Sequence, residues 1–294
     1  MAAEKTAAEN KRSEIKRIIK DTKSLPTLPG VIAKLGSLAD NDKVSMQEMA
    51  SVVNKDYVLS AKLLKLVNSA FYGFSGRVST VSNAIILLGV NVIKSLAISS
   101  SIFEIMEKNV IGLWEHSMGT AVAANSIAKA LKLPEPEEIS TAALLHDIGK
   151  VIIKINLKED YNLLSQRIHE KDLMMIEAER ELLGTDHAEI GEWLTQTWLL
   201  PEKLIEPIAF HHDVKNATVH QDKTAVVHVA DVLIKGFGFG FGGDEIVPCI
   251  QPAAWDHLSL TEEFLEEIIP EIEEKLVEVM NFSLEVQAGN GATT

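Results

Sequence analysis

Histidine and aspartate residues recur in the second half of the chain in a pattern that suits metal binding. Nine histidines are present, and one of them, His146, is followed directly by Asp147 at the end of the apolar stretch TAALLHDIGK. Gly149 lies just beyond, which suits a helix end, where two adjacent side chains can point toward one ion. Imidazole nitrogen and carboxylate oxygen together suit Fe, Mn, Zn or Co better than Ca or Mg. The His-Asp pair therefore predicts a transition-metal site.

Other residues on separate predicted helices or helix ends could complete such a site. They are His116, His187, His211, His212 and Asp231. Asp231 is the most informative, because it lies within the apolar sequence VVHVADVLI, and a carboxylate is costly to bury unless it is paired or bound to metal. A single histidine at a helix end is usually a structural residue, and a His-His pair is often solvated. The ordered set as a whole favours a shared site over coincidence.

The remaining histidines are predicted to lie outside this set. His169 and His220 are expected on the surface, and His257 in a loop. His228 lies about one turn before Asp231, so it is either a core residue or a support behind a ligand.

Helical periodicity dominates the sequence that must position these residues. Strand signals are nearly absent. The hairpin signal would be an Asn-Gly pair between two alternating apolar runs, and Asn290-Gly291 has no such runs around it. The predicted helices cover residues 11–20, 45–54, 58–69, 80–88, 90–107, 111–131, 137–153, 159–171, 173–183, 186–198, 201–212 and 220–235. The sequence therefore predicts an all-α fold.

A glycine- and phenylalanine-rich stretch, GFGFGFGG, follows the last of these helices at residues 236–243. It contains a formal GxGxxG match, but the dinucleotide-binding motif needs a preceding strand, and here a helix precedes it. We therefore reject a dinucleotide site. Two alternatives remain: a mobile loop, or a partner-binding patch that exposes Phe237, Phe239 and Phe241.

The composition of the 294-residue chain limits the classes of function. Hydrophobic residues make up 46% of it, enough for a substantial core, and the formal net charge is −14. Such an acidic chain repels phosphate backbones, so nucleic acid is an unfavoured partner. Basic residues do gather between Lys5 and Lys23, but acidic residues are interleaved with them, which favours a solvated helix face over nucleic-acid or membrane contact.

Several features predict a cytoplasmic protein with no membrane span. The most apolar run, Ala84 to Phe103, contains Lys94 near its middle, which would be costly in lipid. The N-terminal residues lack the apolar segment of a secretion signal. Cys249 is the single cysteine and cannot form a disulfide within the chain, which fits a reducing compartment.

Segments in both halves of the chain are similar to those of a known family. They are LPTLPGVIAKL at 25–35, VVNKDYVLSAKLLKLVNSAFYG at 52–73, AIILLGVNVIKSLAI at 84–98 and, in the second half, the His…His-Asp…Asp set. With them the sequence resembles the HDOD family (HD-related output domain), a branch of the HD-domain superfamily of metal-dependent phosphohydrolases found in bacterial signalling proteins. The resemblance implies an N-terminal helical bundle over residues 1–110 and an HD-type helical metal-binding core over 111–282. We expect residues 283–294 to form a flexible tail.

The resemblance also implies which residues hold metal. One divalent ion would be bound by His116, His146, Asp147 and Asp231. In two-metal relatives, a second ion shares the aspartate that matches Asp147 and is bound by histidines that match His187 and His211. His212 resembles the second member of a His-His pair in HD-GYP phosphodiesterases. Two ions are therefore expected, iron or manganese, with Zn, Ni or Co as alternatives.

Two departures from related enzymes narrow the activity. The HHExxDGxGYP stretch of HD-GYP enzymes is missing, since HHDVKNATVH follows here, and this argues against cyclic di-GMP hydrolysis. Gly112 replaces a glutamate that some three-metal relatives use, so a third ion is not expected.

Three functions remain open. The first is a metal-dependent phosphohydrolase acting on a phosphorylated or nucleotide ligand, with Asp147 and Lys150 as candidate catalytic residues; Lys150 matches a lysine that faces substrate in several HD enzymes. The second is a non-catalytic signalling module that binds a protein partner and holds a structural metal. The third is a di-iron oxygenase, which would use the same ligand types. The sequence does not predict the oligomeric state.

Overall fold

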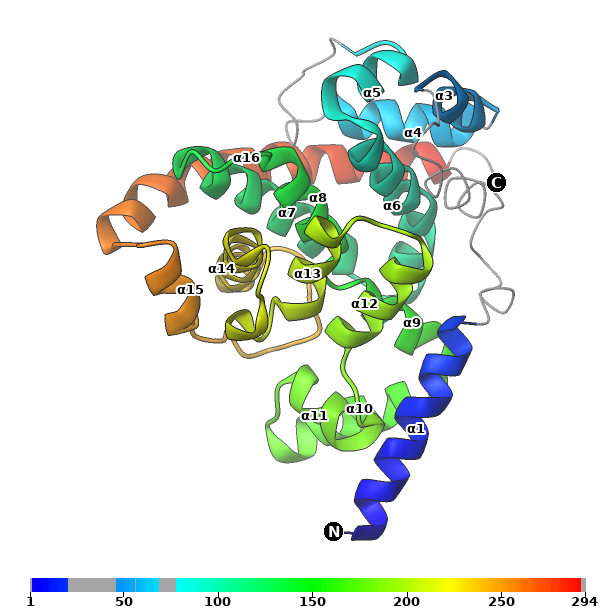
Figure 1. The fold of residues 1–294 in the computed structure, drawn as a ribbon, viewed down its shortest axis with the longest axis vertical. Helices are drawn as coiled ribbons and strands as arrows, with labels where there is room; N and C mark the ends of the chain where they lie inside the picture. The colour runs from blue at the N-terminus through cyan, green and yellow to red at the C-terminus, as the bar shows by residue number, and fades with distance from the viewer. Residues whose placement is uncertain (1, 21–45, 56, 69–77, 292–294) are drawn as a thin grey trace.

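The computed structural model describes residues 2–20, 46–55, 57–68 and 78–291. Within these ranges the regular secondary structure is helical and contains no strand, which confirms the all-α prediction (Figure 1). The first motif of the family resemblance, at 25–35, and the end of the second, from residue 69 to 73, lie outside the described residues.

The helices follow one another with short connections. In chain order they are α1 (Ala2–Lys20), α3 (Met46–Asn54), α4 (Tyr57–Val67), α5 (Val81–Leu88), α6 (Val90–Asn109), α7 (Leu113–Ala130), α8 (Pro136–Leu145), α9 (Ile148–Asn156), α10 (Lys158–Lys171), α11 (Met175–Leu183), α12 (His187–Thr197), α13 (Glu202–Phe210), the 3₁₀ turn η2 (Val214–Asn216), α14 (Gln221–Phe237), α15 (Pro252–His257) and α16 (Glu262–Gly291).

The N-terminal group of helices, α3 to α6, gathers at one end of the molecule, and α6 leads from it toward α8 and α9 (Figure 1). Its apolar stripes are buried, as at Met49, Leu63 and Ile93. Lys94 is also buried in α6, where its Nζ donates to the carbonyl oxygen of Leu199 at 2.8 Å. Among the described helices, none combines the length and apolarity that crossing a bilayer requires.

Helix α7 forms the centre of the second half and packs against α8, α14 and α16 (Figure 1). It is buried along nearly all of its length because small residues allow its neighbours to approach closely. At Gly119, for example, a Cβ atom would lie 2.8 Å from the ring of Phe239 and 3.2 Å from the side chain of Ile234. This packing places His116, in the first turns of α7, inside the core.

The basic N-terminal helix α1 packs against α11 and α12 (Figure 1). Ile15 and Ile19 face inward and are buried. Arg12 Nε donates to Glu189 Oε2 at 3.1 Å, and Lys11 Nζ lies 2.8 Å from Asp160 Oδ2. Lys11 and Arg12 are thus paired with acidic side chains of the same chain.

The structure differs from the sequence prediction in four places. Helix α1 begins at Ala2, earlier than the predicted start at residue 11. The single helix predicted over 137–153 is two helices, α8 and α9, which meet at His146 and Asp147. Helices α15 and α16 were not predicted. A flexible tail was expected from residue 283, whereas α16 continues to Gly291, and the three residues after it lie outside the described part of the chain.

Candidate metal centre

The predicted ligands come together in the core of the second half. Five elements or helix junctions carry them: α7 (His116), the α8–α9 junction (His146 and Asp147), the start of α12 (His187), the end of α13 (His211 and His212) and the middle of α14 (Asp231). All are buried except His212, which is half-buried.

The break between α8 and α9 turns two adjacent side chains into the same space. His146 Nδ1 lies 2.6 Å from the carbonyl oxygen of Ala143, which fixes the ring as the helix ends. Gly149 then lets α9 approach α12, since a Cβ atom there would overlap the carbonyl group of His187. On α12, the side chain of Asp186 accepts from the backbone N–H of Glu189 at 2.9 Å and caps the helix that His187 begins.

One half of the cluster consists of His116, His146 and Asp231. Their nearest ligand atoms all lie within 4.8 Å of one another. The Nε2 atom of His116 is 3.0 Å from Asp231 Oδ1, and that of His146 is 3.5 Å from the same oxygen. Asp147 Oδ2 lies beside this group, 3.6 Å from His116 Nε2 and 3.3 Å from His146 Nε2.

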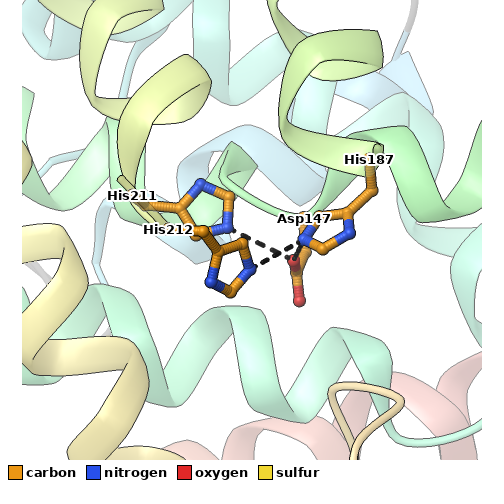
Figure 2. Close-up of side chains that lie close together, drawn as sticks. All are labelled: Asp147, His187, His211 and His212. Carbon is orange, nitrogen blue, oxygen red and sulfur yellow. Dashed lines mark hydrogen bonds and ion pairs between the residues drawn. The ribbon is translucent and has the colours of Figure 1, made fainter. Parts of the chain in front are cut away.

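The other half consists of Asp147, His187, His211 and His212, which Figure 2 shows converging from the α8–α9 junction, the start of α12 and the end of α13. Asp147 Oδ1 lies 3.3 Å from His187 Nε2 and 3.8 Å from His211 Nε2. The Nε2 atoms of His187 and His212 are 2.9 Å apart. The two oxygens of Asp147 therefore face different halves, which is the arrangement that a carboxylate bridging two ions requires.

Buried polar atoms are normally hydrogen-bonded, and here several are not. Within the described residues, the buried atoms without a hydrogen-bond partner include His116 Nε2, His146 Nε2, Asp147 Oδ1, His211 Nε2 and Asp231 Oδ1. All five belong to this cluster. Divalent transition-metal ions would satisfy these lone pairs, so the donor set fits the metal that the sequence predicted.

The electrostatics of the cluster leave most of the imidazoles neutral. Burial lowers the pKa of His187 and His212 well below the ordinary value and that of His211 to about 3, so these three rings are uncharged at neutral pH. Although burial opposes it, the charges of Asp147 and Asp231 raise the pKa of His146 to about 9. An ion bound at His146 would therefore displace a proton.

Three residues that the sequence did not predict support the ligands with side chains that are nearly or fully covered. Lys235 Nζ lies 2.9 Å from Asp231 Oδ2 and 3.4 Å from Asp244 Oδ2. Glu179 Oε2 lies 2.6 Å from His187 Nδ1. Glu179 could have been found, because it falls in the apolar stripe of α11, where a carboxylate needs the same explanation as Asp231.

The other histidines lie outside the ligand set. His228 supports it from behind, since its Nδ1 lies 2.8 Å from the carbonyl oxygen of His211 and its Nε2 accepts from the backbone N–H of Gln251 at 2.9 Å. His257 ends α15 instead of lying in a loop, and it pairs with Asp222. His169 is exposed on α10, and His220 precedes α14.

The glycine-rich stretch at residues 236–243 covers one side of the centre. Lys150 Nζ donates to the carbonyl oxygen of Gly242 at 2.5 Å. The backbone N–H of Phe241 donates to the carbonyl oxygen of Gly112 at 2.9 Å. Phe241 is exposed, whereas Phe237 and Phe239 pack against the core, so the predicted three-residue patch is reduced to one side chain.

This cover also explains Gly112. Its φ is +83°, and a Cβ atom there would lie 2.8 Å from the backbone nitrogen of Phe241. The loop backbone thus occupies the space that any side chain at this position would enter. A glutamate ligand at position 112 is incompatible with this loop position.

Gly242 provides a test of how closely the loop approaches the ligands. A Cβ atom there would lie 3.1 Å from His116 Nε2, so valine would crowd the coordinating nitrogen. We expect Gly242→Val to weaken metal retention by the half with His116, His146 and Asp231 by roughly tenfold or more, as changes beside a ligand commonly do. Elemental analysis after dialysis would measure it. Gly236→Val is the control, because its Cβ atom would meet only the side chain of Val247 at 4.0 Å; equal retention by both variants would contradict this placement of the loop.

Comparison with known proteins is consistent with this geometry. The HDOD domain model matches residues 25–214. An HDOD domain protein of unknown function from Geobacter sulfurreducens is 26% identical, with a TM-score of 0.67 and coverage of 91% of this chain and 96% of that one. A candidate phosphohydrolase from Shewanella amazonensis SB2B has the same TM-score at 24% identity and covers 91% and 97% of the two chains, which shows the fold alone.

A relative from Treponema pallidum (strain Nichols) aligns over a shorter region. This uncharacterized protein is 27% identical over 197 residues, which are 66% of this chain and 38% of that protein. The matched region therefore makes up well under half of the longer relative.

Proposed function

The chain belongs to the HDOD domain family, and from this premise we propose that it is a signalling protein whose core holds two transition-metal ions and hydrolyses a phosphorylated ligand. One observation carries the proposal: the imidazole Nε2 and carboxylate Oδ atoms of the cluster converge on both sides of Asp147. Such ions would supply Lewis acidity toward a phosphoryl oxygen and a nucleophile at neutral pH. Iron or manganese suits the mixed imidazole and carboxylate donors.

Different residues would bind the ions and bind the phosphorylated ligand. Asp147 would hold both halves of the centre in register through its two oxygens. Lys150, 2.8 Å from Asp147 Oδ2, places a positive charge at the centre that would offset charge on a phosphoryl group. His212 is the half-buried member of the cluster, so a ligand would reach the centre from its side.

A second candidate, a regulatory module with a structural metal, is favoured by the closure of the site. The Lys150 ammonium group donates to Asp147 and to the carbonyl oxygen of Gly242. The loop therefore uses the positive charge that a phosphorylated substrate would need. In that case the centre would stabilise a surface for a protein partner. The di-iron oxygenase remains an alternative with the same ligands, and the signalling partner and the cytoplasmic location remain predictions.

Turnover by the metal-loaded protein separates these functions. The chain, loaded with Mn or Fe, would be incubated with a panel of phosphomonoesters, nucleotides and cyclic nucleotides. The readouts would be release of phosphate or nucleoside from the monoesters and nucleotides, and formation of the linear nucleotide from the cyclic ones. We expect hydrolysis of at least one class that Lys150→Met reduces by roughly 10²-fold or more, the usual cost of losing a charge-stabilising group. A fully loaded protein inactive on the whole panel would contradict hydrolysis and favour the regulatory module; oxygen uptake by the reduced iron form would identify an oxygenase.

A further inference from the structure

Glu179 is a fully buried carboxylate outside the predicted ligand set. It lies on α11, and its Oε2 accepts from the backbone N–H of His187 at 2.9 Å while lying 2.6 Å from the Nδ1 of the same residue. Glu179 therefore holds both the backbone and the ring of one predicted ligand. None of the functions considered above uses it.

The contacts of Glu179 favour protonation of His187 on Nδ1. Because Oε2 accepts a backbone N–H, it is an acceptor oxygen, and the complementary partner is a protonated Nδ1. The lone pair then remains on Nε2, which lies 3.3 Å from Asp147 Oδ1. The ring is thereby oriented toward the centre in the form that binds metal.

His187 differs in this respect from two neighbouring histidines of the cluster. Nδ1 of His146 lies 2.6 Å from the carbonyl oxygen of Ala143, and that of His211 lies 2.8 Å from the carbonyl oxygen of Ile208. Those partners are neutral backbone groups, whereas His187 faces a carboxyl group. Burial raises the pKa of Glu179 well above the ordinary value, and a cation bound at the centre would favour its ionised form. An ionised carboxylate behind a ligating imidazole fixes its tautomer and makes it a more basic ligand.

We propose that Glu179 is a positioning residue of the metal centre: it holds His187 with Nε2 toward Asp147 and so sets how tightly the half with His187, His211 and His212 retains its ion. This inference rests on the proposed function only in that the centre binds metal; it does not require hydrolysis. Helix α11 is itself held at its first residue, where the backbone N–H of Met175 donates to Asp244 Oδ1 at 2.6 Å. Glu179 thus has a fixed support.

The test compares Glu179→Leu, which removes the acceptor, with Glu179→Gln, which keeps an acceptor oxygen without the charge. Full-length proteins would be loaded with Mn, dialysed against graded chelator and measured for ions per chain. We expect Glu179→Leu to lose one of the two ions at a chelator strength roughly 10–100-fold lower than wild type, with Glu179→Gln between them. In ¹⁵N-histidine spectra of the metal-free protein, the Nδ1-protonated signal of His187 should persist in Glu179→Gln and change in Glu179→Leu.

Glu206→Gln is the matched control, because Glu206 is also a buried carboxylate but accepts from the backbone N–H groups of Thr218 and Val219. It should keep both ions. The proposal is overturned if Glu179→Leu retains both ions like wild type, if it loses both together, or if the control loses the same ion. A wild-type chain that binds two ions but hydrolyses nothing would refute the proposed function and leave the role of Glu179 intact; a chain that binds none would refute both.

Discussion

Replacing Asp147 with alanine is expected to remove both ions from the centre and to abolish hydrolysis. Asp147 is the residue whose two oxygens face both halves, with Oδ2 3.3 Å from His146 Nε2 and Oδ1 3.3 Å from His187 Nε2. The change would also leave Lys150 buried without its carboxylate partner. Loss of several kcal/mol of Lewis-acid stabilisation corresponds to a rate decrease on the order of 10³-fold or more. Ion content and turnover would be measured on the same preparation.

Asp222→Ala is the control for this variant. Asp222 is exposed at the start of α14 and pairs with His257, remote from the cluster in its contacts. It should keep two ions and full turnover. An Asp147→Ala protein that folds and still holds two ions would contradict the bridging role.

Gly149→Ala is expected to have the largest effect on stability among single-methyl additions. A Cβ atom at this position would lie 2.7 Å from the carbonyl carbon and 2.9 Å from the Cα atom of His187. These are backbone atoms, which cannot relieve the overlap by a change of rotamer. Helices α9 and α12 would have to separate, which we expect to lower the free energy of unfolding by about 3 kcal/mol or more. Urea denaturation of the metal-free proteins would measure the change without a contribution from bound ions.

Gly236→Ala provides the matched comparison for this substitution. Gly236 lies in the last turn of α14, where an added Cβ atom would meet only Val247 at 4.0 Å. Because alanine favours helix over glycine, this variant should be unchanged or more stable by up to about 1 kcal/mol. If the two alanine variants unfolded at the same urea concentration, the close contact of α9 with α12 would be wrong.

The metal ligands that were easiest to predict from the sequence share one physical property. Asp231 and the His146-Asp147 pair lie in apolar helical stretches, where burial of charge demands a partner, and that demand can be read without coordinates. Glu179 carries the same signal in the stripe of α11. Which oxygen of Asp147 faces which histidines depends on how α7, α12 and α13 pack, and local sequence does not encode this.

The cover over the centre could not be predicted, because its contacts join residues far apart in sequence. Gly242 meets Lys150, and Phe241 meets Gly112, through backbone atoms that leave no pattern in the side chains. Helix α16 did have a readable pattern, with Ile268, Ile272 and Leu276 buried four residues apart. Pro270 within it argues against an uninterrupted helix by local rules, yet the packed apolar face keeps the helix continuous.

The most direct test of the metal centre is the ion content of the wild-type protein. The full-length chain would be purified without added metal or chelator, and its metals would be measured against protein concentration by elemental analysis and native mass spectrometry. The proposed function predicts two transition-metal ions per chain, falling to none in Asp147→Ala. A wild-type chain that contains no metal, and binds none when Fe, Mn, Zn, Ni and Co are supplied, would contradict the account and leave a helical scaffold with an unexplained cluster of buried histidines.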